Sequence, residues 1–204
     1  MLSGCMIVQD EESCIARALN SLHPFVDEIV VVDGGSVDST MQIAQSYEKV
    51  KLFEIPFARN FALQKNNALE RASGDWLFLL DADEYIERYV GQSLARLISG
   101  EYGNYDAYGF NRQTFIDKWF ANPANPDWQI RLFRNYVRYV HELHESPEGF
   151  KQLQLSNLSI KHYKTNAMQD KDNRLYWDMG QEPPNGWVKI NDVWTYTAPG
   201  GKNG

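Results

Sequence analysis

The sequence predicts an α/β fold in which a mostly parallel sheet is flanked by helices, and three observations support this prediction. Short apolar runs alternate with segments of helical spacing over about the first eighty residues. The apolar runs show almost no polar alternation, which indicates strands buried on both faces. Three of the runs end on acidic residues, at the position where open parallel sheets bind their ligands.

The first half of the chain is expected to follow the order β-α-β-α-β-α-β. Strands are predicted at the apolar runs, residues 4–9, 29–32, 49–55 and 76–80. Helices are predicted between them, at residues 12–22, 39–47 and 57–73. Ser39 or Thr40 is expected to cap the second helix, and Gly74 to end the third. Right-handed crossovers then bring the carboxyl ends of the strands to one edge of the sheet.

The second half has a different pattern. Residues 102–117, 128–140 and 155–163 are rich in aromatic and β-branched residues, which predicts strands, and residues 166–180 are expected to form a helix. The tail from Gln181, with Pro183, Pro184 and several late glycines, is predicted to be irregular. We therefore expect one domain with a ligand-binding βα half at 1–100, a smaller mixed region at 101–180 and an irregular tail at 181–204.

Composition excludes several classes of protein. The net charge of −7 argues against nucleic acid as a partner, because no dominant basic field exists. The two cysteines imply no disulfide framework and fit a reducing compartment. The amino terminus lacks the pattern of a signal peptide, and no stretch is long enough to span a bilayer. These features favour a cytoplasmic protein, and peripheral contact with a membrane surface stays open.

The stretch GDWLFLLDADEYIER ends an apolar run on three carboxylates, Asp81, Asp83 and Glu84. Such carboxylates repel one another and lose hydration, so a compensating charge is expected from outside the chain. An EF-hand loop does not fit, because Tyr85 and Ile86 stand where a ligand and a glycine are needed. No G-x-G-x-x-G follows the first strands, which argues against a dinucleotide dehydrogenase. The pattern favours Mg²⁺ or Mn²⁺ held by one or two carboxylates together with substrate phosphates.

Several segments together carry a resemblance to a known family: CMIVQDEE, DEIVVVDGGSVDST, NNALERASGDWLFLLDADE, and WQIRLFRN followed by HELHES. Over residues 4–165 the chain resembles family 2 glycosyltransferases with a GT-A fold, and in particular small lipopolysaccharide-core-type glucosyltransferases. The resemblance implies a nucleotide-sugar donor that is UDP-linked, a divalent metal and inversion at the anomeric carbon. It also implies a glycan or lipid-linked glycan as the acceptor.

The resemblance implies several site residues, position by position. Glu11 matches the acid after the first strand, near the base, and Asp33 matches the second-strand acid that contacts the nucleoside. Asp81 and Asp83 match the D-x-D motif, so we expect Asp83 to be the main metal ligand and Asp81 to contact ribose or a metal-bound water. Lys65 stands where many relatives carry Arg, and an exposed helix lysine is its alternative. Many relatives have Asp-Asp-Gly-Ser where this chain has Asp-Gly-Gly-Ser, which leaves the base contact open.

The general base of an inverting transfer is expected in the second half, because the D-x-D is occupied on the diphosphate side. The acidic candidates are Asp127, Glu142, Glu145 and Glu148. When RLFRNYVRYVHELHE is laid on the family pattern without a gap, the His-Glu of that pattern falls on His144 and Glu145. Glu145 is therefore the predicted base. Strand alternation would place Glu142 on the opposite face, and a solvated polar turn is the alternative for this segment.

His162 resembles the late histidine that closes some GT-A metal sites, and a structural histidine is its alternative. Two functions from different classes stay open. One is an enzyme that transfers a sugar from a nucleoside diphosphate to a hydroxyl group. The other is a non-catalytic GT-A-like module that binds a nucleotide sugar or a glycan without turnover. A sugar-nucleotide-forming enzyme is disfavoured, because the amino terminus has no Gly-rich, basic phosphate loop.

Overall fold

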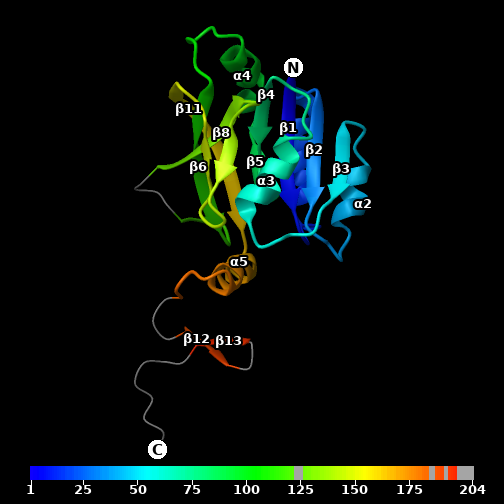
Figure 1. Cartoon of the computed structure of the whole chain (residues 1–204), viewed down its shortest axis with the longest axis vertical. Helices are drawn as coiled ribbons and strands as arrows, with labels where there is room; N and C mark the ends of the chain where they lie inside the picture. The colour runs from blue at the N-terminus through cyan, green and yellow to red at the C-terminus, as the bar shows by residue number, and fades with distance from the viewer. Residues whose placement is uncertain (122–125, 184–186, 191–192, 197–204) are drawn as a thin grey trace, which may run out of the picture. The chain divides into compact units, whose positions relative to one another are not determined.

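The structure is a computed structural model that describes residues 1–121, 126–183, 187–190 and 193–196. The chain divides into two compact units, Met1–Tyr163 and Lys164–Gly204, and each is described by itself. The first unit holds the large sheet, and the second holds a helix and a small two-stranded sheet (Figure 1).

Four parallel strands form the amino-terminal half of the large sheet. They are β1 (Leu2–Val8), β2 (Glu28–Asp33), β3 (Val50–Glu54) and β4 (Trp76–Leu79). Their order is β3-β2-β1-β4, and each neighbouring pair is parallel. All residues of β2 and β4 are buried, as expected from apolar runs without alternation. The predicted alternation of strands and helices is confirmed.

The second half of the unit extends the same sheet. Its strands are β5 (Glu84–Ile86), β6 (Ala107–Ile116), β7 (Trp119–Phe120), β8 (Asp127–Arg134) and β11 (Leu153–Lys164). The sheet continues from β4 in the order β8-β6-β11-β5, and β7 pairs with β6. Both β4 and β6 are antiparallel to β8, so β4 and β6 run in the same direction. Two further strands, β9 (Arg138–Val140) and β10 (Ser146–Glu148), pair with each other.

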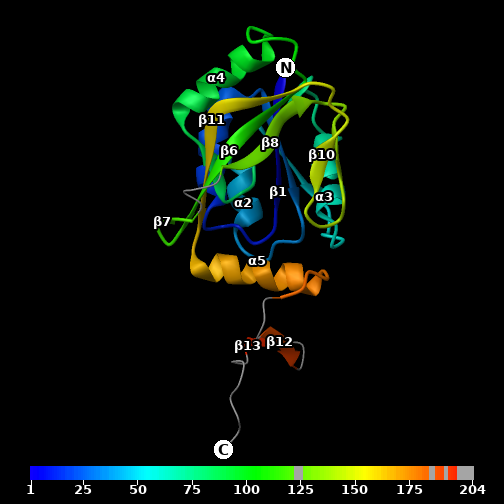
Figure 2. The same cartoon turned by 90° about the vertical axis from the view of Figure 1, so that its left-hand side faces the viewer.

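Helices cover both faces of the sheet, and Figure 2 shows α3 and α4 on opposite sides of it. The helices of this unit are α1 (Ile15–Leu22), α2 (Thr40–Gln45), α3 (Phe61–Leu69) and α4 (Arg88–Ile98), with a 3₁₀ turn at His23–Phe25. The α/β fold class, a curled sheet flanked by helices, is therefore confirmed.

A buried cluster joins the sheet to α3. It contains Cys5, Val30, Val32, Ala62, Ala68, Leu69, Leu77, Leu79, Ala107, Phe133, Val137 and Tyr139. Burial of this much apolar surface is the main force that holds a helix against a sheet. Because α3 also carries Lys65, the cluster fixes the position of that lysine relative to β4.

Two helix ends differ from the prediction. Ser39 precedes α2 but makes no capping bond with its side chain, and the Asp38 carboxylate instead accepts a 2.9 Å hydrogen bond from the Thr40 N–H. Helix α3 ends at Leu69 and not at Gly74. The glycine serves close packing, because a Cβ atom there would lie 2.6 Å from the Oγ of Ser3.

The second unit contains α5 (Asn166–Asp178), β12 (Trp187–Ile190) and β13 (Val193–Tyr196). The two strands pair in antiparallel fashion. The tail predicted to be irregular over 181–204 thus contains two short paired strands. Their aromatic and β-branched residues favour strands, and the prolines and glycines of the tail lie outside them. Among the described residues, no helix has the length and apolar character needed to cross a membrane.

Candidate functional site

The carboxyl ends of β1, β2 and β4 lie together at one edge of the sheet, as the topology predicts. Val8 of β1 is in register with Asp33 of β2, and Cys5 of β1 is in register with Leu79 of β4. The Gly34 N–H, just after β2, donates to the Val8 carbonyl at 2.7 Å. The acidic residues that follow these strands therefore share one edge of the sheet.

Asp81 belongs to a chain of alternating charges at this edge. Its Oδ2 accepts a hydrogen bond of 2.6 Å from Arg131 Nη2, and its Oδ1 lies 3.8 Å from Lys65 Nζ. The same Lys65 Nζ donates to Glu145 Oε1 at 2.5 Å. Burial opposes ionisation of Asp81, but Arg131 and Lys65 outweigh it and hold the pKa of this carboxyl well below its usual range. Three predicted site residues, Asp81, Lys65 and Glu145, are thus in one network.

Lys65 is buried, so its alternative interpretation as an exposed helix lysine is wrong. Its side chain is 7% exposed, and its Nζ lies 5.0 Å from the centroid of the Tyr139 ring. Burial lowers the pKa of Lys65, but Asp81, Tyr139 and Glu145 together raise it above its ordinary value. The lysine is therefore a protonated bridge between two carboxylates.

Much of the charge that compensates the DADE carboxylates comes from within the chain, contrary to the expectation. Arg131 of β8 is buried, and its Nη2 donates to Asp81 Oδ2 and to Glu84 Oε1, both at 2.6 Å. Burial raises the pKa of Glu84 more than Arg131 lowers it, and Asp81 raises it further. Arg131 lies in the RLFR motif and was not among the predicted site residues. A basic residue inside an apolar strand was the signal for it.

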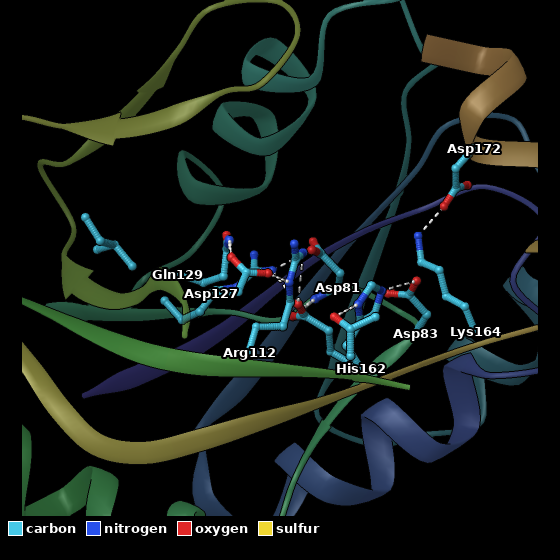
Figure 3. Close-up of polar contacts among 12 residues, drawn as sticks. Asp81, Asp83, Arg112, Asp127, Gln129, His162, Lys164 and Asp172 are labelled. Atoms are coloured by element: carbon cyan, nitrogen blue, oxygen red, sulfur yellow. Dashed lines mark hydrogen bonds and ion pairs between the residues drawn. The ribbon is translucent and has the colours of Figure 1, made fainter. Parts of the chain in front are cut away.

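Asp83 faces His162 (Figure 3). His162 Nε2 lies 2.9 Å from Asp83 Oδ2, and His162 Nδ1 lies 3.0 Å from the Thr114 hydroxyl. A partner on one ring nitrogen fixes the orientation of the ring and presents the other nitrogen to a ligand. The histidine is buried, so a structural role and a ligand role are compatible.

The Asp83–His162 pair fits a divalent cation as part of a ligand set. One carboxylate oxygen and one imidazole nitrogen lie side by side, and Mg²⁺ or Mn²⁺ at phosphate sites leaves other positions to water and substrate oxygens. Within the described part of the chain, no three His, Cys, Asp or Glu side chains are grouped so as to hold a metal by themselves. Other positions around such a cation would be open to water and substrate oxygens. Asp81 is less suited to this task, because Arg131 and Lys65 hold its carboxylate.

Asp33 and Glu11 lie at the same edge and contact neighbouring residues of the chain. Asp33 Oδ1 accepts hydrogen bonds of 2.8 Å from the N–H groups of Gly35 and Ser36, and its Oδ2 accepts one from the Ser36 hydroxyl. The carboxylate therefore organises the loop after β2. Glu11 Oε2 accepts a hydrogen bond of 3.0 Å from the Cys14 thiol.

Residues 141–145 of the HELHES segment form a bend between β9 and β10, and Ser146 begins β10. His141 and His144 have φ angles of 70° and 56°, in the left-handed region. The strand alternation expected to separate Glu142 from Glu145 is therefore wrong, although their side chains do differ in exposure. Glu142 is exposed, whereas the Glu145 side chain is 16% exposed and contacts Lys65.

A second group of charged and polar side chains contains Arg112, Asp127 and Gln129 (Figure 3). Arg112 Nε donates to Asp127 Oδ2 at 2.8 Å, and the Gln129 amide donates to Asp127 Oδ1 at 2.7 Å. Arg112 Nη1 also lies 3.8 Å from Glu84 Oε1. Asp127, one of the candidate bases, is thus held by Arg112.

Ionisable side chains gather at the carboxyl edge of this sheet, which is the edge where open α/β sheets bind their ligands. The chain therefore has the architecture of a ligand-binding α/β protein. Within this class, the family model of glycosyl transferase family 2 matches residues 3–161. The chain therefore belongs to glycosyl transferase family 2, and the resemblance drawn from its motifs is confirmed.

Similar proteins include the lipopolysaccharide core biosynthesis glycosyltransferase LpsC of Rhizobium meliloti. LpsC is 35% identical over 102 residues, which cover 48% of this chain and 37% of LpsC. The crystal structure of S. aureus TarS 1-349 in complex with UDP-GlcNAc has a TM-score of 0.62 at 19% identity, covering 81% of this chain and 58% of that chain.

A third similar protein is the glucosyl-3-phosphoglycerate synthase of Mycobacterium tuberculosis, solved with Mn²⁺, UDP and phosphoglyceric acid. Its TM-score is 0.54 at 13% identity, and the match covers 96% of this chain and 85% of that chain. The two solved structures show the fold that this chain shares with glycosyltransferases of the GT-A type. The chain spans 20% and 37% of the lengths of two curated relatives that it matches.

Proposed function

We propose that the chain transfers a sugar from a UDP-linked nucleoside-diphosphate sugar to a hydroxyl of a glycan or lipid-linked glycan, with inversion at the anomeric carbon. One observation carries the proposal: the Asp83–His162 pair and the Lys65-bridged carboxylates Asp81 and Glu145 occupy one edge of the sheet. The TarS complex with UDP-GlcNAc and the synthase complex with Mn²⁺ and UDP support the donor and the metal. The name of LpsC supports the class of acceptor.

Asp83 and His162 are proposed to hold Mg²⁺ or Mn²⁺, whose charge neutralises the departing diphosphate. Thr114 keeps the imidazole oriented, with Nε2 toward Asp83. Asp81 stays ionised because Arg131 holds it, and an ionised carboxylate is a strong acceptor for the hydroxyls of ribose.

The loops after β1 and β2 are proposed to receive the nucleoside. Asp33 fixes the N–H groups of Gly35 and Ser36, so the loop after β2 is preorganised for a planar ligand beside it. Glu11 lies at the same edge, as the family pattern implies for the acid near the base.

Glu145 is proposed as the general base. The acceptor oxygen forms a bond to the anomeric carbon on the face opposite the diphosphate, the bond from that carbon to the phosphate oxygen breaks, and the hydroxyl proton passes to the Glu145 carboxylate. Lys65 Nζ, 2.5 Å from Glu145 Oε1, holds the base in the network that contains Asp81. This arrangement couples the position of the base to that of the donor.

A panel of nucleotide sugars tests the proposal by thermal shift, with Mn²⁺ and with EDTA. A ligand that binds the native state alone raises the melting temperature by mass action, so a UDP-sugar should give a metal-dependent increase. Asp83→Asn should remove most of this increase, because the carboxylate beside His162 is lost. Asp75→Asn is the matched control, since Asp75 is 72% exposed and pairs with the amino terminus.

Two outcomes would change the proposal. Nucleotide affinity that is unchanged by Asp83→Asn and by EDTA would contradict the metal assignment. Binding of a donor with no transfer or hydrolysis on any donor and acceptor of the panel would favour the non-catalytic GT-A-like module.

A further inference from the structure

The β6–β7 hairpin carries a highly exposed tryptophan at the edge of the sheet that holds the candidate site. Because β6 runs in the direction of β4, its carboxyl end lies at the same edge as Asp81. Trp119 of β7 pairs with Ile116 of β6 and is 81% exposed. Large aromatic side chains supply much of the contact area at binding surfaces. Whether this side chain can meet a ligand of the site depends on the face of the sheet that it occupies.

Trp119 lies on the site face, defined as the face of the sheet that carries Thr114, Arg131 and His162. Thr114 of β6 points to this face, because its hydroxyl contacts His162. Side chains alternate along a strand, so Ile116 points to the same face. Residues that are directly paired across two strands also share a face, and Trp119 is paired with Ile116.

The opposite face of the hairpin is anchored by a stack of aromatic rings. Phe120 stacks on Phe115 at 5.1 Å, Phe115 stacks on Tyr163 at 4.6 Å, and Tyr163 stacks on Tyr85 at 5.8 Å between centroids. The guanidinium of Arg17 lies 5.3 Å from the centroids of both tyrosines. The aromatic stack thus fixes the hairpin on one face, and Trp119 is exposed on the other. A side chain on a fixed backbone loses less entropy when a ligand binds to it.

We propose that Trp119 is a platform on which a sugar ring of the acceptor stacks, an inference that rests on the proposed glycosyl transfer. One face of a sugar ring carries C–H groups while its hydroxyls lie at the rim, so the ring can cover a flat indole and keep its polar groups in water. The platform lies on the same strand pair as Thr114, which orients His162. An acceptor held there approaches the site from the face that Asp83 and His162 occupy.

The charges of the hairpin favour a sugar over a lipid surface as its ligand. The turn between β6 and β7 consists of Asp117 and Lys118, whose charges are opposite, and the chain carries a net charge of −7. Segments that bind anionic membranes carry clusters of lysine and arginine around their aromatic residues. The nearby cations Arg17 and Lys161 contact the aromatic stack on the opposite face, so among the described residues no such cluster surrounds Trp119, and a neutral sugar needs none.

Indole NMR signals of protein labelled with ¹⁵N-tryptophan test the platform directly. The chain has six tryptophans, and the signal missing from Trp119→Phe identifies that of Trp119. Methyl glycosides of one to three sugars are titrated in the presence of UDP and Mg²⁺, and the Trp119 signal should shift. Trp128 is the internal control: it is 40% exposed, and it pairs with Asn111, which places it on the opposite face. Its signal should stay unchanged.

Kinetics provide the second measurement. Trp119→Ala should raise the KM for a glycoside acceptor by about tenfold, with donor affinity unchanged, and Trp128→Ala should have no effect. The proposal is overturned if no glycoside shifts the Trp119 signal, whether or not transfer occurs, or if lipid vesicles shift it and glycosides do not. Glycosides that shift the signal without transfer of any donor would leave the platform standing and contradict the proposed transfer.

Discussion

Buried carboxylates occupy both edges of the large sheet, and the two edges balance their charge in different ways. At the amino edge, Glu28 begins β2. Its Oε1 accepts hydrogen bonds from the hydroxyls of Ser3 and Ser73 and from the Ser73 N–H, at 2.6–2.7 Å, and its Oε2 accepts one from Lys51 at 2.5 Å. Burial alone would raise the pKa of Glu28, but the bonds from Lys51 and Ser73 lower it to about 2.

At the carboxyl edge, two acids share one nitrogen of a single cation. Arg131 Nη2 lies 2.6 Å from both Asp81 and Glu84, and Arg131 Nε has no hydrogen-bond partner in the described part of the chain. Burial raises the pKa of Glu84 more than Arg131 lowers it, whereas Arg131 and Lys65 together outweigh burial and lower the pKa of Asp81. The shared cation does not stabilise both charges fully.

The different balance of charge at the two edges indicates that they have different roles. Both carboxylate oxygens of Glu28 accept hydrogen bonds from the chain, and these bonds join the starts of β1, β2 and β3. The role of this cluster is therefore structural. At the Asp81 cluster one arginine serves two acids, so we expect a ligand to balance the remaining charge there, as in sites that trade stability for binding. Substitutions at the amino edge should therefore affect stability alone, whereas those at the carboxyl edge should affect activity.

The largest expected effect is that of Glu145→Gln. Loss of a general base costs about 10²–10⁴-fold in rate, so turnover should fall by this order. Donor affinity and the free energy of unfolding should change little, because the amide oxygen introduced at this position can still accept a hydrogen bond from Lys65 Nζ. Steady-state transfer, donor titration and denaturant unfolding of the same variant measure the three quantities.

Glu142→Gln is the matched control for this variant. Glu142 lies in the same bend but is exposed, so its turnover should stay within a few-fold of the parent. The opposite ranking of the two variants would assign the base to Glu142. Full activity in both would remove the bend from the mechanism.

The fold was largely predictable because its first half follows local rules. Apolar runs without alternation predict β1, β2 and β4 with their parallel connections, and the crossover rule places Asp33 and Asp81 at one edge from the sequence alone. The short strand β5 was missed, since its three residues follow the DADE acids directly and offer no periodicity of their own.

The site was less predictable because its contacts span long stretches of sequence. Arg131 reaches Asp81 across 50 positions and Glu84 across 47, and this meeting depends on the antiparallel pairing of β8 with β4. The bend at HELHES depends on left-handed φ angles at two histidines, which no local pattern signals. The family resemblance points to Glu145 and uses neither the Arg131 contacts nor the bend. The ion pair with Lys65 explains why the side chain of Glu145 turns inward and that of Glu142 does not.

The second prediction concerns the shared cation. Arg131→Met leaves the buried Glu84 and the partly exposed Asp81 together with too little positive charge, and breaking a buried ion pair costs about 3–5 kcal/mol. Arg131→Lys should cost less, because it keeps the charge but loses the planar fork. Denaturant unfolding measures both variants.

Arg138→Met serves as the control, since this arginine is 40% exposed and its contact with Glu70 is long, at 3.9 Å. It should cost less than about 1 kcal/mol. An Arg131→Met variant as stable as this control would mean that the carboxyl edge does not depend on the shared cation, and the contrast between the two edges would fail.

The smallest effect is expected at the amino edge, for Glu28→Gln. The substitution removes the charged oxygen that accepts from Lys51, while Oε1 keeps its three donors from Ser3 and Ser73. This should cost about 1–3 kcal/mol in the free energy of unfolding. Because Glu28 lies at the edge far from Asp81, donor affinity and turnover should equal those of the parent protein.

The pH dependence of the destabilisation by Glu28→Gln tests whether the charge of Glu28 causes it. Folding lowers the pKa of Glu28 from an ordinary value of 4.5 to about 2, so the ionised carboxylate contributes its full stability above pH 4.5 and loses it as the pH falls toward 2. The difference in stability between the parent and Glu28→Gln should therefore be constant above about pH 5 and shrink below it. Glu70→Gln, at a side chain that is 58% exposed, should show almost no difference at any pH. A Glu28→Gln cost that does not shrink in acid would mean that the carboxylate acts through its shape and not through its charge.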